Sequence, residues 1–133
     1  MDITLTPPSP IDVKTLYDET GWADHPIETF ERALAGSWIV CSAREADGTL
    51  LGIGRLIGDG GLHAFVTELI VTERSRGRGI GARILERLVA ESRARGVDDI
   101  QLFAARGKSS FYEQHGFARR PHDAPGMDVV ARG

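Results

Sequence analysis

The sequence predicts a mixed α/β fold of the α+β type: a mostly antiparallel sheet with one splayed central parallel strand pair and helices on both faces. Three observations lead to this fold class. Strand-length apolar runs alternate with segments of helical periodicity. Short turns join three successive strands, which predicts an antiparallel meander. One long amphipathic helix then separates two strands, which predicts a parallel crossover.

The chain is expected to begin with a short strand and two short helices. Residues 1–6 alternate and end at a proline pair. Ser9 followed by a proline is a typical helix start and predicts a helix over 10–20. A second helix is expected over 24–35, closed by a glycine. Two helices this early suggest a flap over a site rather than a sheet crossover.

Three strands are expected next, over 37–43, 49–57 and 62–71. Short turns join these strands, which predicts an antiparallel meander. The turn sequences between them are Asp47-Gly48 and Asp59-Gly60-Gly61.

The second half of the chain is expected to add the parallel strand. A helix over 79–95 carries apolar residues on one face, and a strand over 98–105 follows it. A short helix over 108–114 and two last strands over 117–120 and 127–131 complete the order β-α-α-β-β-β-α-β-α-β-β. Where the pairing changes from antiparallel to parallel the sheet splays, and the freed backbone can bind an extended ligand.

Composition predicts an ordinary cytoplasmic domain. The 133 residues, 41% apolar and 26% charged, suit a single domain over 1–133. The chain shows no apolar run long enough to span a membrane, and its start does not resemble a secretory signal. A lone cysteine, Cys41, fits a reducing compartment, and its apolar surroundings favour a core residue over a nucleophile.

Charge is distributed unevenly along the chain. The net charge of −3 argues against general nucleic-acid binding, and no membrane partner is expected. Residues 1–50 contain nine acidic and three basic residues, whereas residues 51–133 contain ten acidic and thirteen basic ones. The acidic half could attract a cationic amine, and solvated helix faces explain it equally well.

A glycine-rich turn at the start of the 79–95 helix carries the first chemical signal. The sequence Arg76-Gly77-Arg78-Gly79-Ile80-Gly81 follows a strand that ends at Val71. The first N–H groups of a helix lack internal partners, and glycines let a ligand approach the backbone closely, so the turn suits a phosphate. The spacing matches neither a P-loop nor a dinucleotide fingerprint. The alternative is a plain turn with a helix cap.

A second motif follows the predicted parallel strand. Phe111-Tyr112 lies on the short helix, and Gly116-Phe117 comes directly after it. With this motif and the glycine-rich turn in this order and at this spacing, the sequence resembles the GNAT superfamily of N-acyltransferases. The resemblance is strong over 62–120 and extends over nearly the whole chain.

The resemblance implies acetyl-CoA as cosubstrate and no metal. Backbone groups of the glycine-rich turn would hold the pyrophosphate, and the end of the preceding strand would pair with the pantetheine arm. Phe111 would contact the coenzyme or pack in the core. The implied coenzyme-binding residues are Leu69, Ile70, Val71, Arg76, Gly77, Arg78, Gly79, Ile80, Gly81 and Phe111.

The resemblance also implies direct attack of an amine on the thioester. Tyr112 would protonate the leaving thiolate, and its alternative role is that of a packed aromatic residue. The backbone N–H of Ile70 would polarise the thioester carbonyl. Glu68 is the candidate base or a structural carboxylate, and His63 is a weaker candidate. The histidines of the chain show no metal-ligand spacing.

The acceptor is expected to be the primary amine of a small molecule. Trp22, His25 and Arg55 are its candidate binding residues. Packing is the alternative for Trp22, and an ion pair with Asp59 is the alternative for Arg55. Two other functions remain open: acetylation of a protein lysine or N-terminus, and acyl-CoA sensing without catalysis. Exposed edge strands make a homodimer plausible.

Overall fold

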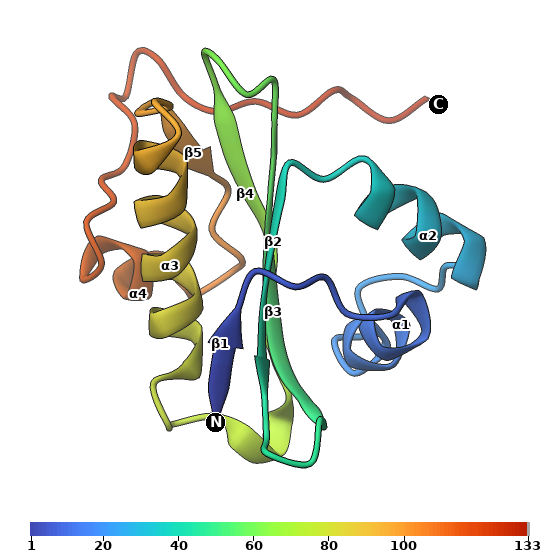
Figure 1. Cartoon of the computed structure of the whole chain (residues 1–133). Coiled ribbons are helices and arrows are strands. Elements are labelled where there is room, and N and C mark those ends of the chain that lie inside the picture. Colours follow the sequence, from blue (N-terminus) through green and yellow to red (C-terminus); the bar gives the residue numbers. More distant parts are fainter. Residues whose placement is uncertain (133) are drawn as a thin grey trace. The chain divides into compact units, whose positions relative to one another are not determined.

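The computed structural model describes residues 1–132 and groups the chain into two compact units. The first unit is Met1–Leu102, and the second begins at Phe103. Figure 1 shows the sheet and three helices of the first unit, and one short helix in the second. Among the described residues, no helix combines the length and the apolar character needed to cross a membrane.

The first unit follows the predicted element order. It contains β1 (Asp2–Thr4), α1 (Pro10–Asp18), α2 (Ile27–Ala35), β2 (Ile39–Arg44), β3 (Leu50–Gly58), β4 (Ala64–Val71), the 3-10 turn η1 (Glu73–Ser75), α3 (Ile80–Ala94) and β5 (Ile100–Leu102). The second unit contains α4 (Ser109–Glu113).

Local sequence signals start and end these helices. The Ser9 hydroxyl accepts a hydrogen bond from the Asp12 N–H at 3.2 Å, which caps α1. Gly36 ends α2, and its N–H donates to the Arg32 carbonyl at 2.9 Å. At the start of α3, Gly79 adopts φ +76°, a left-handed conformation that glycine tolerates without a steric penalty.

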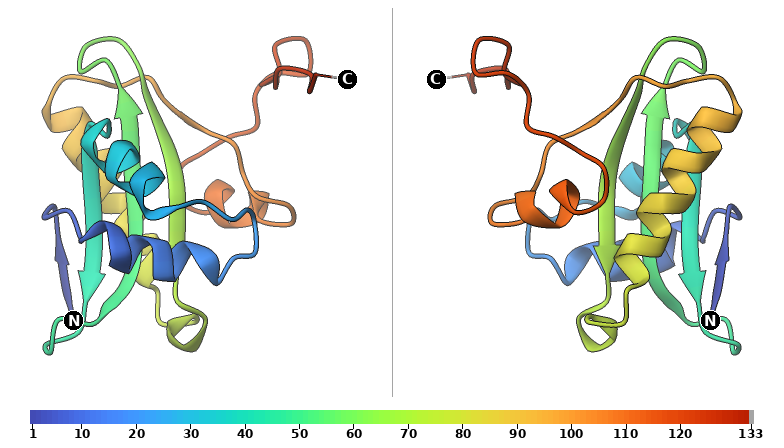
Figure 2. Two further views of the ribbon diagram at one scale, coloured as in Figure 1. Left: turned by 90° about the vertical axis from the view of Figure 1, so that its right-hand side faces the viewer. Right: turned by 90° about the vertical axis from the view of Figure 1, so that its left-hand side faces the viewer.

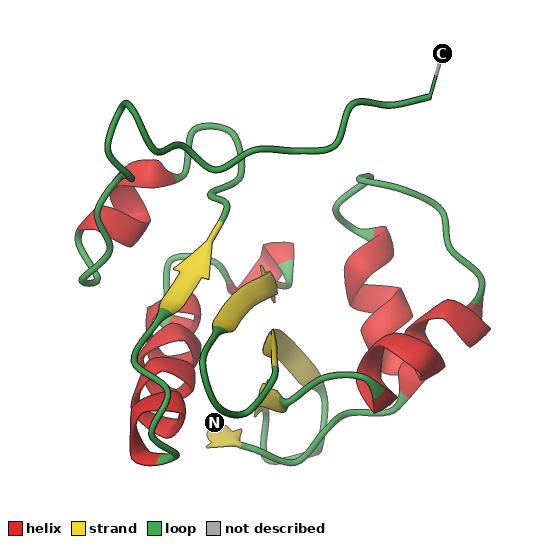
Figure 3. Ribbon diagram, turned by 90° about the horizontal axis from the view of Figure 1, so that it is seen from above, coloured by secondary structure: helices red, strands yellow, loops and turns green. Residues whose placement is uncertain are grey.

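The sheet confirms the predicted mixed topology. Its strands lie in the order β1-β2-β3-β4-β5. The first four pair antiparallel as a meander, and β5 runs parallel to β4 after the α3 crossover. In Figures 2 and 3, α3 covers one face of this sheet, while α1 and α2 cover the other. The prediction of helices on both faces is therefore confirmed.

The α3 side of the core depends on close approach of helix and sheet. The apolar stripe of α3 is fully buried. A Cβ added at Gly54 of β3 would lie 2.8 Å from Ile84 and 2.9 Å from Leu88. Gly54 therefore lets the helix sit closer to the sheet than a larger residue would allow. The buried stripe consists of Ile80, Ile84, Leu85 and Leu88.

The other side of the core lies beneath α1 and α2. Ile53 of β3 and Ile70 of β4 pack there against helical side chains. This second layer also gives the two short helices a fixed position on the sheet face, because their apolar sides are buried against it. The helical members of the cluster are Val13, Leu16 and Phe30.

A bulge interrupts the pairing of β3 with β4. Ile53 pairs with Ile70 and Arg55 with Thr67, so two residues of β4 lie opposite one residue of β3. Glu68 has φ +47°, and no other non-glycine residue in 1–132 has a positive φ. Strict alternation along β4 would turn Glu68 toward α3. The extra residue instead lets Glu68 meet Arg55 on the α1–α2 face.

The structure corrects the predicted strands at the end of the chain. Residues 117–120 and 127–131 were expected to form strands, but residues 103–132 contain none. A strand needs a backbone partner and a buried apolar face, yet Val129 and Val130 are 96% and 88% exposed. The predicted 98–105 strand shortens to Ile100–Leu102, because its pairing with β4 ends at Leu102.

Candidate functional site

The sheet opens where β4 and β5 diverge. β5 pairs with β4 only along Ala64–Val66, whereas β4 continues to Val71. The segment Leu69–Val71, expected to hold the pantetheine arm, therefore lies beyond the last β5 partner. The β3 strand pairs with Ile70 and Val71 from the other side. An extended ligand can add to such an open strand edge through backbone hydrogen bonds.

The turn after β4 presents backbone donors to a ligand. Gly77 and Gly79 have φ +83° and +76°, and α3 begins directly after them. A side chain caps α1, but along the described chain none caps the N-terminus of α3. The first N–H groups of α3 are thus available, and the helix dipole adds positive potential there. This arrangement fits a pyrophosphate.

The two arginines of the turn differ in what the structure records for them: a backbone hydrogen bond for Arg76 and a side-chain ion pair for Arg78. The Arg76 N–H donates to the Glu73 carbonyl at 3.3 Å. The Arg78 side chain forms an ion pair with Glu45, with 3.2 Å between Nη1 and Oε1. The backbone groups from Gly77 to Gly81 suit an anion, and the role of the arginine charges stays a prediction.

Glu68 and Arg55 form an ion pair on the α1–α2 face of the sheet. Arg55 Nε lies 3.0 Å from Glu68 Oε2, and the two side chains are only 15% and 25% exposed. Arg55 Nη1 also donates to the Ser37 hydroxyl at 3.0 Å and to the Ala33 carbonyl at 3.4 Å. Arg55 therefore holds Glu68 in place. Asp59, the alternative partner of Arg55, instead accepts three backbone N–H groups of its own turn.

Aromatic side chains gather beside this ion pair. Tyr17 is the centre of the group: its ring lies 5.8 Å from Trp22, 5.8 Å from His25 and 5.2 Å from Phe30. Lys14 holds the loop that bears Trp22 and His25, because its ammonium donates to the His25 carbonyl at 2.8 Å. The structure thus brings the predicted acceptor residues Trp22 and His25 together.

Tyr17 is the site residue that sequence reasoning missed. Burial raises the pKa of its phenol, and the negative charges of Glu68 and Asp18 raise it further. The Glu68 carboxylate thus lies near enough to Tyr17 to affect the pKa of its phenol. A signal was present in the sequence, since Tyr17 follows the buried residues Val13 and Leu16 on the same face of α1.

The predicted acid Tyr112 lies in the second unit, on α4. Its ring contacts Phe111 at 5.1 Å and Phe117 at 6.0 Å between centroids, so the two halves of the motif pack together. His115 donates from Nδ1 to the Phe111 carbonyl at 2.7 Å. Burial raises the pKa of the Tyr112 phenol, which keeps it protonated near neutral pH. Its role as the acid stays a prediction.

A comparison with protein families shows which family the chain belongs to. The family described as "Acetyltransferase (GNAT) domain" matches residues 36–119, which is more than half of the chain and includes both motifs. The chain belongs to the GNAT acetyltransferase family. This membership confirms the resemblance inferred from the glycine-rich turn and the Phe111-Tyr112 pair.

Two named relatives differ in their printed acceptors. Serotonin N-acetyltransferase 2, chloroplastic, of Oryza sativa subsp. japonica is 34% identical over 115 residues, or 84% of this chain and 58% of that protein. Histone acetyltransferase TAP1 of Glycine max is 29% identical over 126 residues, or 87% of this chain and 54% of that protein. The GNAT chain thus spans little more than half the length of these relatives.

Solved structures confirm the GNAT fold. The GNAT family protein SP0256 from Streptococcus pneumoniae is 27% identical, with a TM-score of 0.82 and coverage of 99% of this chain and 97% of that chain. Rv2747 from Mycobacterium tuberculosis, solved in complex with CoA, is 21% identical, with a TM-score of 0.74 and coverage of 98% of this chain and 77% of that chain. The mixed sheet of this chain is therefore the GNAT sheet.

No metal is assigned to the GNAT site. Within residues 1–132, histidine, cysteine and acidic side chains do not gather in groups of three or more that could hold an ion. The expectation that the reaction needs no metal stays a prediction.

Proposed function

We propose that this GNAT domain transfers an acetyl group from acetyl-CoA to the primary amine of a small molecule. The observation that carries the proposal is the bulge at Glu68. It places a carboxylate on the α1–α2 face of β4, directly before the open edge Leu69–Val71 and beside the Tyr17 aromatic group. A coenzyme on that edge and an amine on that face would meet at Glu68.

The coenzyme would be held by backbone groups. Gly77–Gly81 offer N–H donors to the pyrophosphate, and Leu69–Val71 offer a strand edge to the pantetheine arm. Ile70 pairs with Ile53 of β3, and the Thr72 N–H donates to the Leu51 carbonyl, so the Ile70 N–H faces β3. The N–H of Leu69 or Val71, which faces the open edge, is therefore proposed to polarise the thioester carbonyl in place of that of Ile70. Acetyl-CoA itself supplies an activated acyl group that an amine can attack directly.

Aromatic side chains and a negatively charged carboxylate would hold the amine. Tyr17, Trp22 and His25 offer aromatic surface, and Glu68 offers a negative charge, a combination that suits a protonated amine with an apolar body. Free alkylamines titrate near a pKa of about 10, so the amine must lose a proton before it attacks. Glu68 is proposed to accept that proton, directly or through water.

The proposed bond changes balance as follows. The amine nitrogen forms a bond to the acetyl carbon, and the bond between that carbon and sulfur breaks. The ammonium gives one proton to Glu68 before the attack. The thiolate takes a proton from Tyr112, and the second proton that the nitrogen loses as the amide forms returns through water to the Tyr112 phenolate. Burial raises the pKa of the Tyr112 phenol, so it is protonated at neutral pH and can donate once the sulfur carries developing charge.

The first experiment measures thiol release from acetyl-CoA with a panel of amines, amino sugars, amino acids and lysine peptides. Release with one class of small amine is expected. Tyr112→Phe is expected to lower turnover by roughly ten- to a thousandfold while coenzyme binding persists, since it removes only the acidic hydroxyl. Full turnover in this variant would exclude Tyr112 as the essential acid.

The same panel separates the two other candidate functions. The relative named as a histone acetyltransferase favours a protein acceptor as the second candidate. Release with lysine peptides alone would select that function. Coenzyme binding without release for any acceptor would select an acyl-CoA sensor.

A further inference from the structure

The Arg55 side chain connects three elements of the first unit. Arg55 lies on β3, and its Nε donates to Glu68 Oε2 of β4 at 3.0 Å. Its Nη1 donates to the Ser37 hydroxyl at 3.0 Å and to the Ala33 carbonyl at 3.4 Å, both at the end of α2. One Nε–H and two Nη1–H groups, three of the five donors of a guanidinium, are therefore used within the protein.

The α2 end of this network suits a guanidinium. The Ser37 hydroxyl donates to the Ala33 carbonyl at 2.7 Å, so its oxygen is turned to accept from Arg55. The last carbonyls of a helix lack internal partners, and a positive charge is favourable at that end of the helix dipole. Ser37 and Ala33 therefore hold the end of the Arg55 side chain that lies away from Glu68.

Arg55 contacts one oxygen of the Glu68 carboxylate and leaves the second. Its Nε bonds to Oε2, and within residues 1–132 the structure contains no hydrogen bond to Oε1. A carboxylate accepts through both oxygens, so Oε1 keeps its lone pairs for a ligand. The Arg55 and Glu68 side chains are only 15% and 25% exposed, so water replaces their contact poorly.

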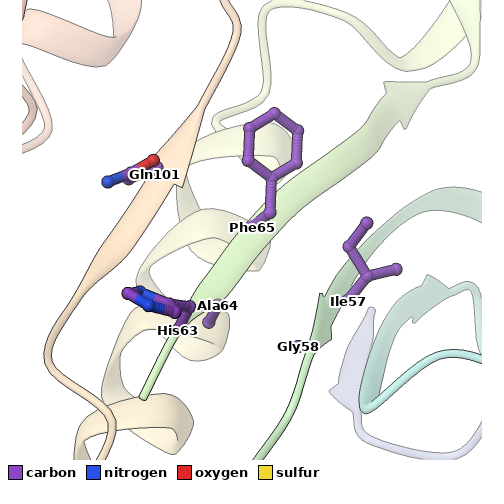
Figure 4. A pocket seen from close by; sticks show the side chains of 6 residues that line it. All are labelled: Ile57, Gly58, His63, Ala64, Phe65 and Gln101. Carbon is purple, nitrogen blue, oxygen red and sulfur yellow. The ribbon is translucent and has the colours of Figure 1, made fainter. Parts of the chain in front are cut away.

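The other candidate base, His63, lies outside this network. It lines a pocket of about 280 Å³ near the start of β4 (Figure 4), and its Nδ1 lies 2.6 Å from Asp99 Oδ2. The lining of that pocket includes neither Arg55 nor Glu68. Of the two candidate bases, Glu68 is therefore the one that Arg55 can position.

We propose that Arg55 is a positioning residue: it holds Oε2 of Glu68 and leaves Oε1 to the acceptor amine, without touching the acceptor itself. Ser37 completes the arrangement, because it holds the opposite end of the guanidinium. The inference rests on the proposed function, in which Glu68 accepts the amine proton. It adds that this proton transfer depends on the end of α2, the helix that carries Phe30 of the aromatic group.

Arg55→Lys tests this role while keeping the positive charge. A lysine ammonium is a single point and cannot reach Glu68 and Ser37 together, as the planar guanidinium does. Misplacing a reacting group slows the chemistry, so kcat with the most active amine of the panel should fall roughly ten- to a hundredfold. The KM for acetyl-CoA should change by less than about twofold, since no proposed coenzyme contact is altered. An unchanged kcat would overturn the inference.

A double-mutant cycle with Glu68→Gln separates positioning from direct contact. If Arg55 acts through Glu68, Arg55→Lys should change kcat by less than about twofold once the carboxylate is gone. An equal loss with and without the carboxylate would overturn the inference, because Arg55 would then act on its own. A raised KM for the amine with an unchanged kcat would also overturn it, because Arg55 would then bind the acceptor.

Ser37→Ala tests the same network without altering either charge, and it serves even if Arg55→Lys fails to fold. The loss of one of the two α2 acceptors should lower kcat by about two- to fivefold, and the effect should vanish in Glu68→Gln. Arg93→Lys, on an exposed position of α3, is the control for the arginine change and should keep the parent kcat. A parent-like kcat in Ser37→Ala would overturn the inference.

An NMR measurement keeps this inference separate from catalysis. The Nε–H signal of Arg55, identified by its loss in Arg55→Lys, should exchange with solvent more slowly than that of the exposed Arg93. This protection should be lost in Glu68→Gln. Exchange as fast as that of Arg93 in the parent protein would overturn the inference whatever the activity. Protection that depends on Glu68, without acetylation of any amine, would support the contact and contradict the proposed function.

Discussion

At the scale of single residues, Glu68 combines an unusual backbone conformation with a mostly buried carboxylate, which is proposed to act as the base. Left-handed conformations of non-glycine residues cost about 1–3 kcal/mol and persist where the surrounding structure enforces them. Here the enforcing contacts are the β3 pairing and the ion pair with Arg55. Strain of this kind at a carboxylate on an open sheet face is typical of a functional position.

Glu68→Gln tests that role directly. The amide keeps the size of the side chain but can neither accept a proton nor balance the amine charge. We expect kcat/KM for the best amine to fall by about a hundredfold. The control is Glu86→Gln, on an exposed position of α3, which should act like the parent protein. Equal activity of the two variants would show that Glu68 is only structural.

Burial of Cys41 suppresses the reactivity of its thiol. It is fully buried in β2, and burial raises the pKa of its thiol to about 11. In the unfolded chain the thiol ionises nearer its usual pKa, so this group makes folding less favourable as pH rises from about 8.5 toward 11.

We therefore expect the native protein to resist a thiol-specific reagent at pH 7–8, and to react once unfolded in urea. Labelling rates read from absorbance or mass spectrometry measure this difference. Rapid labelling of the folded protein would contradict the buried position of Cys41 and restore it as a candidate nucleophile.

At the scale of secondary-structure elements, the contact of α3 with β3 sets the position of the glycine-rich turn. The helix is anchored by its apolar stripe, and Gly54 removes the side chain that would hold it away from the sheet. Because Gly79 caps the same helix, a shift of α3 also shifts the backbone donors proposed for the pyrophosphate.

Gly54→Ala is expected to lower the free energy of unfolding by about 1–3 kcal/mol, since the added methyl group overlaps Ile84 and Leu88. Urea denaturation measures the change. Gly61→Ala is the matched control: its new Cβ would meet only Asp59, at 3.9 Å, and its φ is not positive. An equal loss in both variants would mean that alanine destabilises for another reason.

The prediction of elements succeeded wherever a pattern was long, whereas short patterns gave mixed results: β1 and α4 formed as expected, but the last two strands did not. The α3 periodicity and the three-strand meander have many buried positions, and both are confirmed. The expected strands over 117–120 and 127–131 rested on short apolar runs. In the structure these runs form no strand within residues 103–132. Short runs cannot distinguish a strand from an extended loop, because the partner strand is not encoded locally.

At the scale of the first unit, α1 is tied to the turn that leads into α3. Glu19, at the end of α1, accepts hydrogen bonds from the Thr72 hydroxyl at 3.1 Å and from the Glu73 N–H at 3.1 Å. This contact joins the helix that carries Tyr17 to the segment that carries the glycine-rich turn. The proposed amine and coenzyme sites are thereby linked through one carboxylate.

Glu19→Ala should therefore affect both stability and coenzyme binding. We expect the free energy of unfolding to fall by about 1–2 kcal/mol, because the buried Thr72 hydroxyl loses its acceptor. The Kd for coenzyme A, measured by calorimetry, should rise. Glu31→Ala, on an exposed position of α2, is the control and should change neither quantity. A normal Kd in Glu19→Ala would argue against the link.

Several expectations concern the protein as a whole. Size-exclusion chromatography with light scattering would test the predicted homodimer. The cytoplasmic location, and the absence of nucleic-acid and membrane partners, stay predictions.

The sequence by itself determined the family, the mixed sheet and the residues of the two motifs. These depend on local signals: glycines where a turn needs φ above zero, a helical stripe, and strands of fixed length. The tertiary structure alone decided that Arg55 pairs with Glu68, that Tyr17 joins Trp22 and His25, and that His63 meets Asp99. Such pairs depend on register, and one extra residue in β4 changes which face a side chain occupies.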